Sequence, residues 1–400
     1  MPASAHSPST NPVTCYLVGD EGVLFVKATQ RLYRLNPTAA YIWCCCEDGL
    51  SPLAIAGAMA ERFGISRKLA RRDVVRTFAH WSSEGLLFID AGAPAPHPLR
   101  PEQAAEPRPA FVADLVLPGS SFAHRYRLLD VDLRIRYPSR QAETRVHPIL
   151  AHLEKARGAD RSPTRVNFDI AEAANGYVLL RDGAPTSACD NLGALAPMIQ
   201  REALITAYEA TACKAAVHAA AVCAERRCVL LPGAKGSGKS TLTAALVAAG
   251  FTYLTDELSL LTSGLGRFRA APVSLGLKSG SWPLLATRFR GLEGLPKHRQ
   301  ADGREVRYLA PPHDAALDQR AHTAECLVFP QYEAGGMTEL SSLGPVEALY
   351  RLAEAGYAVP DSLDDERVQF LINWVGQLDC YRLRMGDIAS AVLKIQELLT

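Results

Sequence analysis

The chain has no excess of charge of either sign and no long apolar run. Its 43 Lys and Arg residues balance 42 Asp and Glu residues, which leaves a formal net charge of +1. This balance gives no overall attraction to nucleic acid or anionic lipid. No apolar stretch reaches the roughly 18 residues that a membrane-spanning helix needs, and no secretory leader is recognisable. We therefore expect a cytoplasmic protein with neither nucleic-acid nor membrane partners.

The 10 cysteines lack the spacing of a metal site or a disulfide framework. Cys44, Cys45 and Cys46 are adjacent, and consecutive helical side chains point about 100° apart, without the CxxC or His partners of zinc. Cys223 and Cys228 flank a predicted hairpin tip. Because a cytosolic compartment keeps thiols reduced, we interpret these cysteines as small buried hydrophobic residues.

A chain of 400 residues that is 48% hydrophobic is long enough for two or three domains. The clearest change in composition is a Pro- and Ala-rich stretch, which predicts an extended linker. The predicted boundaries are a first domain at residues 12–91, the linker at 92–110, a β-rich region at 111–200 and a helix-strand region at 201–400.

The N-terminal domain is predicted to contain a three-stranded meander followed by three helices. Short β-like runs separated by turns predict strands at residues 15–18, 23–26 and 32–35. Helix starts are indicated by Asn36-Pro37, Ser51-Pro52 and Ser66, because Asn and Ser cap helices and proline suits the first turn. A short apolar run at residues 86–89 predicts one more strand.

The region after the linker carries further β-like runs, at residues 126–133, 164–170 and 177–181. Two dipeptides that favour tight hairpin turns, Asn175-Gly176 and Asp182-Gly183, flank the last run.

The most specific motif is GAKGSGKS at residues 233–240, which matches G-x-x-x-x-G-K-[ST] at every fixed position. A predicted strand at residues 228–231 precedes it and a predicted helix at 241–249 follows. Glycines let backbone N–H groups approach phosphate oxygens, and the helix N-terminus adds its positive end. We expect ATP, with GTP as the alternative, and Mg²⁺. The expected nucleotide-binding residues are Gly233, Ala234, Lys235, Gly236, Ser237, Gly238, Lys239, Ser240 and Thr241.

An acidic pair, Asp256-Glu257, ends the next predicted strand at residues 251–255. The short spacing after Lys239 leaves room for one helix and one return strand, and no LSGGQ-like segment of ABC-type ATPases occurs. We interpret the pair as the acidic element of the nucleotide site.

The sequence around this loop resembles the HPr serine kinase/phosphorylase family, and more closely the HPr-kinase-related proteins of peptide-modifying gene clusters. His218, in the run VHAA, precedes the loop, and the segment GFTYLTDE ends in the acidic pair; LVFPQY at residues 327–332 and CYRL at 380–383 also match. The resemblance covers roughly residues 110–400. It implies an α/β P-loop kinase core preceded by a β-rich region, and a homo-oligomer.

By position, the resemblance makes Asp256 the general base, Glu257 a metal-side carboxylate with Ser240, and Lys239 the phosphate-binding lysine. The family commonly has Asp where Glu257 stands, so the assignment within the acidic pair stays open. His218 would orient groups or neutralise charge near the transferred phosphate, and the alternative is a core histidine at the end of an Ala-rich helix. Further cations that fit the transferred phosphate are Lys278, Arg267, Arg269 and Arg304.

The N-terminal domain resembles the PqqD-like recognition domain of pathways that modify ribosomally made peptides. The matching runs are YRLN at residues 33–36, AAYIW at 39–43, DG at 48–49, DV at 73–74 and EGLL at 84–87. The resemblance implies a winged-helix-like fold in which a leader peptide adds a strand beside the strand at residues 30–35 and rests on the last helix. The expected peptide-binding residues are Leu32, Arg34, Arg71, Arg72, Val75 and Phe78.

The last helix of this domain is basic, which is also typical of DNA-reading winged folds. Between residues 66 and 85 it has no Asn or Gln to read bases, whereas Phe78 and Trp81 favour an apolar groove. A purely structural lid is a third interpretation of the domain. The basic residues available to attract an acidic leader are Arg67, Lys68, Arg71, Arg72 and Arg76.

Together these patterns predict an ATP-dependent kinase that phosphorylates a Ser or Thr hydroxyl of a precursor peptide captured through its leader. One alternative keeps the fold but makes the substrate a small molecule such as free serine. Another is a nucleotide-hydrolysing peptide chaperone or switch.

Overall fold

The computed structural model describes residues 13–86, 115–119, 121–155, 164–264, 266–311, 319–358 and 362–399. The chain folds into two compact units. The first comprises Met1–Arg100, Gly344–Tyr350 and Asp361–Asn373, and the second comprises Pro101–Leu343, Arg351–Pro360 and Trp374–Thr400. The first unit thus includes two segments from the C-terminal half of the sequence. The predicted linker and residues 87–89 of the predicted extra strand lie outside the described residues.

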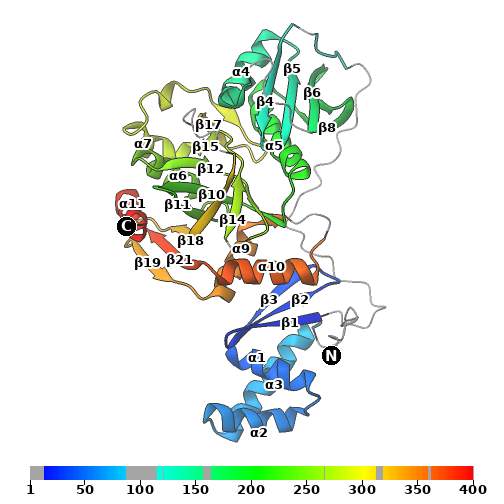
Figure 1. Cartoon of the computed structure of the whole chain (residues 1–400), viewed down its shortest axis with the longest axis vertical. Helices are drawn as coiled ribbons and strands as arrows, with labels where there is room; N and C mark the ends of the chain where they lie inside the picture. The colour runs from blue at the N-terminus through cyan, green and yellow to red at the C-terminus, as the bar shows by residue number, and fades with distance from the viewer. Residues whose placement is uncertain are drawn as a thin grey trace. The chain divides into compact units, whose positions relative to one another are not determined.

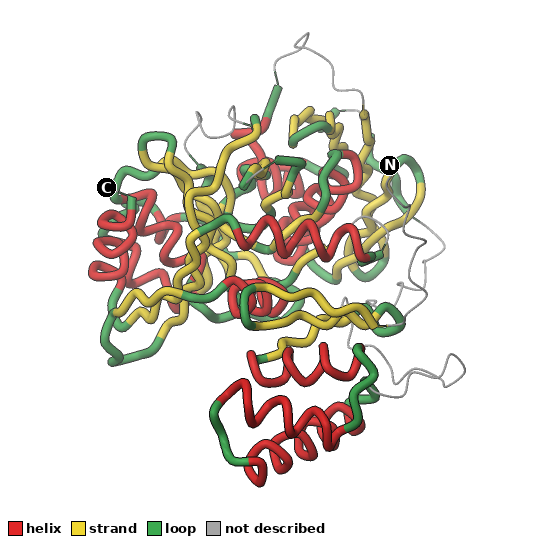
Figure 2. Tube along the Cα trace, turned by 60° about the horizontal axis from the view of Figure 1, so that its bottom comes forward, coloured by secondary structure: helices red, strands yellow, loops and turns green. Residues whose placement is uncertain are grey.

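The first unit has an antiparallel sheet in the order β1-β2-β3 followed by three helices, as predicted (Figures 1 and 2). The side chains of Asn36, Ser51 and Ser66 accept hydrogen bonds at the helix starts, which confirms all three capping predictions. Trp43 and Trp81 pack edge to face in the core, with their ring centroids 5.1 Å apart. The bounds are β1 (Val13–Val18), β2 (Glu21–Val26), β3 (Arg31–Leu35), α1 (Pro37–Glu47), α2 (Pro52–Phe63) and α3 (Arg67–Ser83).

Asp365 ties the segment Asp361–Asn373 to this sheet. Its carboxylate accepts a hydrogen bond from Tyr16 Oη at 2.7 Å and pairs with Lys27 Nζ at 2.7 Å. Leu363 N donates to the side chain of Gln30 at 2.7 Å. These bonds explain why a distant part of the sequence belongs to the first unit.

The second unit begins with a five-stranded sheet in the order β4-β5-β6-β7-β8, which packs against α4 and α5 around one hydrophobic core. The predicted single run at residues 126–133 is wrong, because Leu129 takes a positive φ of 52° and turns the chain into a hairpin. Both predicted turn dipeptides do join strands. The bounds are β4 (Ala123–Leu128), β5 (Val131–Arg136), α4 (Arg140–Leu150), η1 (Ala151–Leu153), β6 (Thr164–Ala173), β7 (Gly176–Arg181), β8 (Ala184–Cys189) and α5 (Leu192–Ala210).

A ten-stranded mixed sheet forms the centre of the second unit. Its main path is β12-β10-β11-β18-β14-β13-β9-β20; off this path, β21 pairs with β18 and β19 pairs with β21. Strands β11, β18 and β21 run parallel, and α6 and α11 cover their apolar side chains. The bounds are β9 (Ala215–Val217), β10 (Ala219–Ala224), β11 (Arg227–Pro232), α6 (Lys239–Ala248), β12 (Thr252–Thr255), β13 (Ser259–Leu261), β14 (Arg267–Ala270), β18 (Ala321–Tyr332), β19 (Glu339–Ser342), β20 (Tyr357–Ala358), β21 (Asp379–Met385) and α11 (Ile388–Leu398).

A small sheet in the order β15-β17-β16 completes the second unit. Helices α9 and α10 each begin in a segment of the first unit and end in the second. The bounds are β15 (Leu275–Lys278), η2 (Ser279–Ser281), α7 (Trp282–Ala286), η3 (Leu292–Gly294), β16 (His298–Arg299), β17 (Glu305–Leu309), α9 (Pro345–Ala355) and α10 (Asp365–Gly376). Along the described part of the chain, we find no helix of the length and apolarity needed to cross a membrane.

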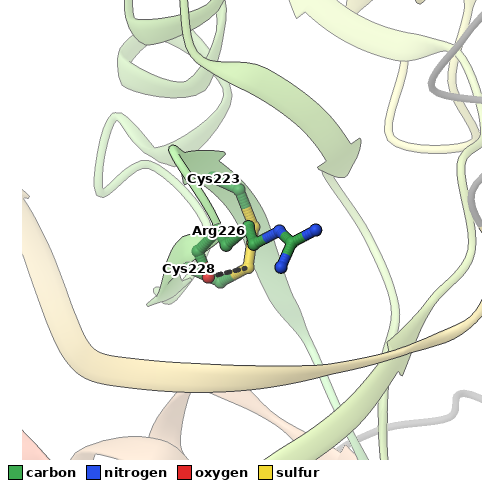
Figure 3. The surroundings of a disulfide bond; sticks show 3 residues. All are labelled: Cys223, Arg226 and Cys228. Atoms are coloured by element: carbon green, nitrogen blue, oxygen red, sulfur yellow. Dashed lines mark hydrogen bonds between the residues drawn. A yellow bond between two sulfur atoms is a disulfide. The ribbon is translucent and has the colours of Figure 1, made fainter.

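Cys223 and Cys228 form a disulfide, so the interpretation of these two cysteines as reduced core residues is wrong (Figure 3). They lie directly opposite each other in the register of β10 and β11, with their Cα atoms 4.1 Å apart. The predicted hairpin tip between them is confirmed, and Glu225 and Arg226 take a positive φ there. Strand pairing therefore placed the sulfur atoms within bonding reach.

Candidate functional site

The loop at residues 233–240 joins the buried strand β11 to α6, as the motif predicted. Gly238 caps the helix with a φ of 89°, and a side chain there would meet Met385 Cε at 2.8 Å. Tyr332 N, at the end of β18, donates to the carbonyl of Ser237 at 3.1 Å. The positive φ favours glycine at position 238, and a side chain there would also displace the end of Met385.

Lys239, the first residue of α6, points into the protein rather than into solvent. Its Nζ donates to Asp256 Oδ1 at 3.2 Å and also to the Asp256 carbonyl. Burial raises the pKa of Asp256, against the opposing charge of Lys239 and a hydrogen bond from Ser240. The other carboxylate oxygen, Oδ2, is buried and has no hydrogen-bond partner among the described residues. The motif residues and the first acidic residue thus meet at one point.

The second acidic residue is paired with the predicted histidine. His218 Nε2 lies 3.1 Å from Glu257 Oε2, and the two side chains are 40% and 36% exposed. Burial disfavours the charged carboxylate, but the hydrogen bond from His218 and the positive charge of Lys239 lower the pKa of Glu257 to about 2. Unlike Asp256, which is fully buried, Glu257 has a partly exposed side chain.

Sheet register explains why these residues meet. Thr255 at the end of β12 pairs with β10, whereas Ser259 at the start of β13 pairs with Val217 of β9. The acidic pair lies in the connection between them, beside His218, which occupies the break between β9 and β10. His218 N also donates to the carbonyl of Gly356 at 2.9 Å. The alternative of a core histidine ending an Ala-rich helix is therefore wrong.

Several cations surround the loop and the acidic pair. Burial and the charges of Arg304 and Lys235 lower the pKa of Lys278 at the end of β15. Asp302 pairs with Lys235 and, at 3.1 Å, with Arg304. No pattern in the sequence points to Asp302, because an isolated acidic residue in a loop carries no motif.

Two other predicted cations do not join this group. Arg269 makes a bidentate pair with Asp130, at 2.7 and 2.9 Å. Arg267 and Arg269 pair in register with the first residues of β18, whereas Tyr332 at the other end of β18 contacts the loop. Their proposed action on a phosphate at the loop is therefore not supported.

The first unit has a groove of about 580 Å³ between β3 and α3. Of the expected peptide-binding residues it includes Arg34, whereas Leu32, Arg71, Arg72, Val75 and Phe78 are not part of its lining. The residues that line it are Tyr33, Arg34, Leu35, Asn36, Thr38, Ala39, Asp73, Arg76, Thr77, His80, Trp81 and Leu86.

Helical geometry explains which residues of α3 line the groove. At about 100° per residue, Asp73, Thr77 and His80 share one face of α3, and Val75 lies on the opposite face. Val75 is 58% exposed, and Phe78 packs against the core beside Trp81. The sequence identified the helix and two of its groove-lining residues, Arg76 and Trp81, whereas the α3 residues expected to bind the peptide lie outside the lining.

Strand β3 is an edge strand, since among the described residues it pairs only with β2. On this strand, Arg34 forms an ion pair with Glu21, with Nη2 2.6 Å from Oε1. Its Nη1 lies 3.7 Å from Glu347 Oε2. On α3, Arg76 pairs with Asp73 at 3.4 Å. The groove therefore combines this strand edge with charges of both signs.

Comparison with known proteins finds a family for part of the first unit. Residues 21–87 match the family model described as Coenzyme PQQ synthesis protein D (PqqD). This part of the chain is a PqqD-type recognition element, and the body that follows is a β-rich α/β unit. Among curated proteins, no relative matches the chain.

Two solved structures are similar to parts of the chain. TbiB1 in complex with the TbiA(beta) leader peptide is 23% identical over 20% of this chain and 96% of that chain, with a TM-score of 0.19. The Hpr(Ser) kinase/phosphatase from Coxiella burnetii is 12% identical over 46% of this chain and 93% of that chain, with a TM-score of 0.23.

Proposed function

We propose that this chain is an ATP-dependent kinase that phosphorylates a Ser or Thr hydroxyl of a precursor peptide held by its PqqD-type domain. The observation that carries the proposal is the convergence of the loop at residues 233–240 with two different carboxylates. Asp256 is buried against Lys239, and Glu257 is accessible and bound to His218. Phosphoryl transfer depends mainly on such positioning and on charge stabilisation.

A nucleoside triphosphate fits the loop on chemical grounds. The glycine-rich backbone turns into the N-terminus of α6, which favours an anion. Ser237 Oγ is buried without a hydrogen-bond partner among the described residues, and it would donate to a phosphate oxygen in the nucleotide complex. Lys235, Lys278 and Arg304 add positive charge around the same loop. Lys239 would contact the phosphates by exchanging its bond to Asp256 for one to the nucleotide.

Mg²⁺ fits the Asp256 side of the loop. Mg²⁺ prefers carboxylate and hydroxyl oxygen ligands, and the unpartnered Asp256 Oδ2 and the neighbouring Ser240 hydroxyl are of this kind. When bound, the ion neutralises charge on the phosphate oxygens. This choice exchanges the roles assigned from the family resemblance, which gave the metal to Glu257.

Glu257 then becomes the candidate general base. Its side chain is partly exposed, its lowered pKa keeps the carboxylate ionised, and His218 holds it through the 3.1 Å contact with Oε2. The carboxylate would accept the hydroxyl proton as the oxygen attacks the terminal phosphate.

The precursor peptide is assigned to the groove beside β3. An extended peptide can add a strand to an exposed sheet edge, and side chains in the groove then supply specificity. Holding the leader raises the effective concentration of the acceptor residue at the kinase site, even when contacts there are weak.

The test is phosphate transfer from radiolabelled ATP by the full-length protein, with a precursor peptide encoded beside its gene. We expect labelled Ser or Thr on the intact precursor and much slower labelling of the same peptide without its leader. Labelling of free serine alone would favour the small-molecule kinase. ATP hydrolysis without labelling of either peptide would favour the chaperone or switch.

A further inference from the structure

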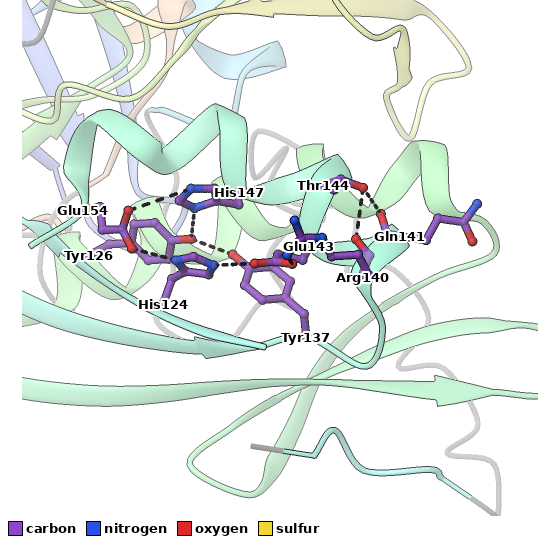
Figure 4. A network of polar contacts seen from close by, with 9 residues as sticks. All are labelled: His124, Tyr126, Tyr137, Arg140, Gln141, Glu143, Thr144, His147 and Glu154. Carbon is purple, nitrogen blue, oxygen red and sulfur yellow. Dashed lines mark hydrogen bonds and ion pairs between the residues drawn. The ribbon is translucent and has the colours of Figure 1, made fainter. Parts of the chain in front are cut away.

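A cluster of two histidines and a glutamate lies in the five-stranded lobe of the second unit (Figure 4). His124 comes from β4, His147 from α4, and Glu154 follows η1. The imidazole rings stack with centroids 4.0 Å apart. Glu154 Oε1 lies 2.6 Å from His124 Nδ1, and Glu154 Oε2 lies 3.8 Å from His147 Nε2. One carboxylate therefore faces one nitrogen of each ring.

The other nitrogen of each ring is held from the outer side of the cluster. His124 Nε2 lies 2.8 Å from Glu143 Oε1, and His147 Nδ1 lies 2.9 Å from Tyr126 Oη. Tyr126 Oη in turn contacts Tyr137 Oη at 2.8 Å. Outer partners that accept N–H hydrogen bonds leave the inward nitrogens as lone-pair donors, which is the usual environment of metal-binding histidines.

We propose that His124, His147 and Glu154 bind a Zn²⁺ ion through His124 Nδ1, His147 Nε2 and the Glu154 carboxylate. One atom from each residue already lies within 4.8 Å of the other two. Zn–N and Zn–O bonds of about 2.0–2.2 Å hold tetrahedral ligand atoms about 3.3 Å apart, so only small side-chain shifts are needed. Two imidazoles and one carboxylate suit zinc and leave the fourth position open.

The local charges favour a cation at this place. His124 lies between two carboxylates, those of Glu143 and Glu154. Arg140 pairs with Glu143 from its outer side at 3.2 Å. A divalent ion beside Glu154 would balance the second carboxylate and tie β4, α4 and η1 together. The competing interpretation is a metal-free network around a protonated His124.

Zinc binding should be measured on untagged full-length protein stripped with a chelator, in the absence of nucleotide. If their disulfide is reduced, Cys223 and Cys228 would form a second ligand group with His322, so the background is the Cys223→Ser/Cys228→Ser variant. Titration against a chromophoric zinc chelator should give one ion per chain. Glu154→Gln and His147→Gln should lose this binding.

A substitution of a residue that contacts a ligand, without being one, distinguishes a metal site from a metal-free structural network. Tyr126→Phe removes the acceptor of His147 Nδ1–H and should weaken zinc binding about 10- to 100-fold. Tyr177→Phe, which packs beside the same core, is the matched control and should bind normally. Zinc should also raise the melting temperature of the background protein but not that of Glu154→Gln.

Absence of zinc binding in the background protein would overturn the proposal, and so would undiminished binding in Glu154→Gln. If the variants lower the melting temperature equally with zinc and with chelator, the cluster is a metal-free structural network. If His147→Gln does not fold, Glu154→Gln decides, because that side chain is 40% exposed.

Discussion

Lys239 Nζ lies 3.2 Å from Asp256 Oδ1, and both side chains are buried. The pair links the first residue of α6 to the acidic segment after β12. A buried ion pair is costly to break on one side, because the remaining charge loses its partner without regaining water. The phosphate-binding lysine of the motif therefore also has a structural partner.

Lys239→Ala should abolish nucleotide turnover and also destabilise the protein. Removing one member of a buried pair typically costs about 3–5 kcal/mol. Adding Asp256→Asn should restore part of the free energy of unfolding but none of the turnover. Urea unfolding and nucleotide consumption measure the two effects. Wild-type turnover in Lys239→Ala would contradict the phosphate-loop assignment.

Glu257→Gln and Asp256→Asn should separate the two carboxylate roles. Glu257→Gln should bind nucleotide and Mg²⁺ normally but transfer phosphate about 10²- to 10⁴-fold more slowly, as expected on loss of a general base. Asp256→Asn should instead need a higher Mg²⁺ concentration for half-maximal rate. Mg²⁺ titrations of transfer by each variant distinguish them, and the opposite pattern would restore the assignment from the resemblance.

Thr77→Trp should block leader binding, because Thr77 lines the groove beside β3. We expect at least a tenfold loss of affinity, or about 1.4 kcal/mol. Val75→Trp is the matched control on the opposite face of α3 and should bind leader normally. Fluorescence anisotropy with a labelled leader peptide measures both. Loss in Val75→Trp alone would favour the face expected from the sequence.

Thr77→Trp and Val75→Trp test leader binding more specifically than deletion of residues 1–105 would. The deletion would remove Tyr16 and Lys27, the partners of Asp365 in the segment Asp361–Asn373. Lost activity after deletion would then mix lost leader binding with damage to the C-terminal segments.

His298 should make stability depend on pH in mildly acidic solution. Burial and the charge of Arg145 lower its pKa to about 4, whereas an unfolded histidine titrates near 6.5. The unfolded state therefore binds more protons than the folded state between these values, and stability falls as pH falls from about 6.5 to 4. The full effect is on the order of 3 kcal/mol.

The matched variant is His298→Phe, which keeps a ring against Tyr308 and does not titrate. Urea unfolding of both proteins at several pH values gives the comparison. Parallel stability curves between pH 4 and 6.5 would show that His298 is not the group responsible.

The sequence by itself determined the features that depend on neighbouring residues. Asn36, Ser51 and Ser66 cap helices wherever the following residues form them, because the capping bond spans only three positions. The loop at residues 233–240 and the turns at Asn175-Gly176 and Asp182-Gly183 are equally local. Their backbone conformations need particular residue types at fixed spacing.

Only the tertiary structure decided which distant residues meet. Strand register paired Cys223 with Cys228 and brought His218 to Glu257. The face of α3 that borders the groove depends on where β3 lies, and the cluster of His124 with its partners requires β4, α4 and η1 to pack together. Burial then gave two adjacent carboxylates different surroundings: Asp256 is buried beside Lys239 with Oδ2 unpartnered among the described residues, and Glu257 is partly exposed beside His218. The reason is that the electrostatic environment of a side chain depends on all the elements around it rather than on its sequence neighbours.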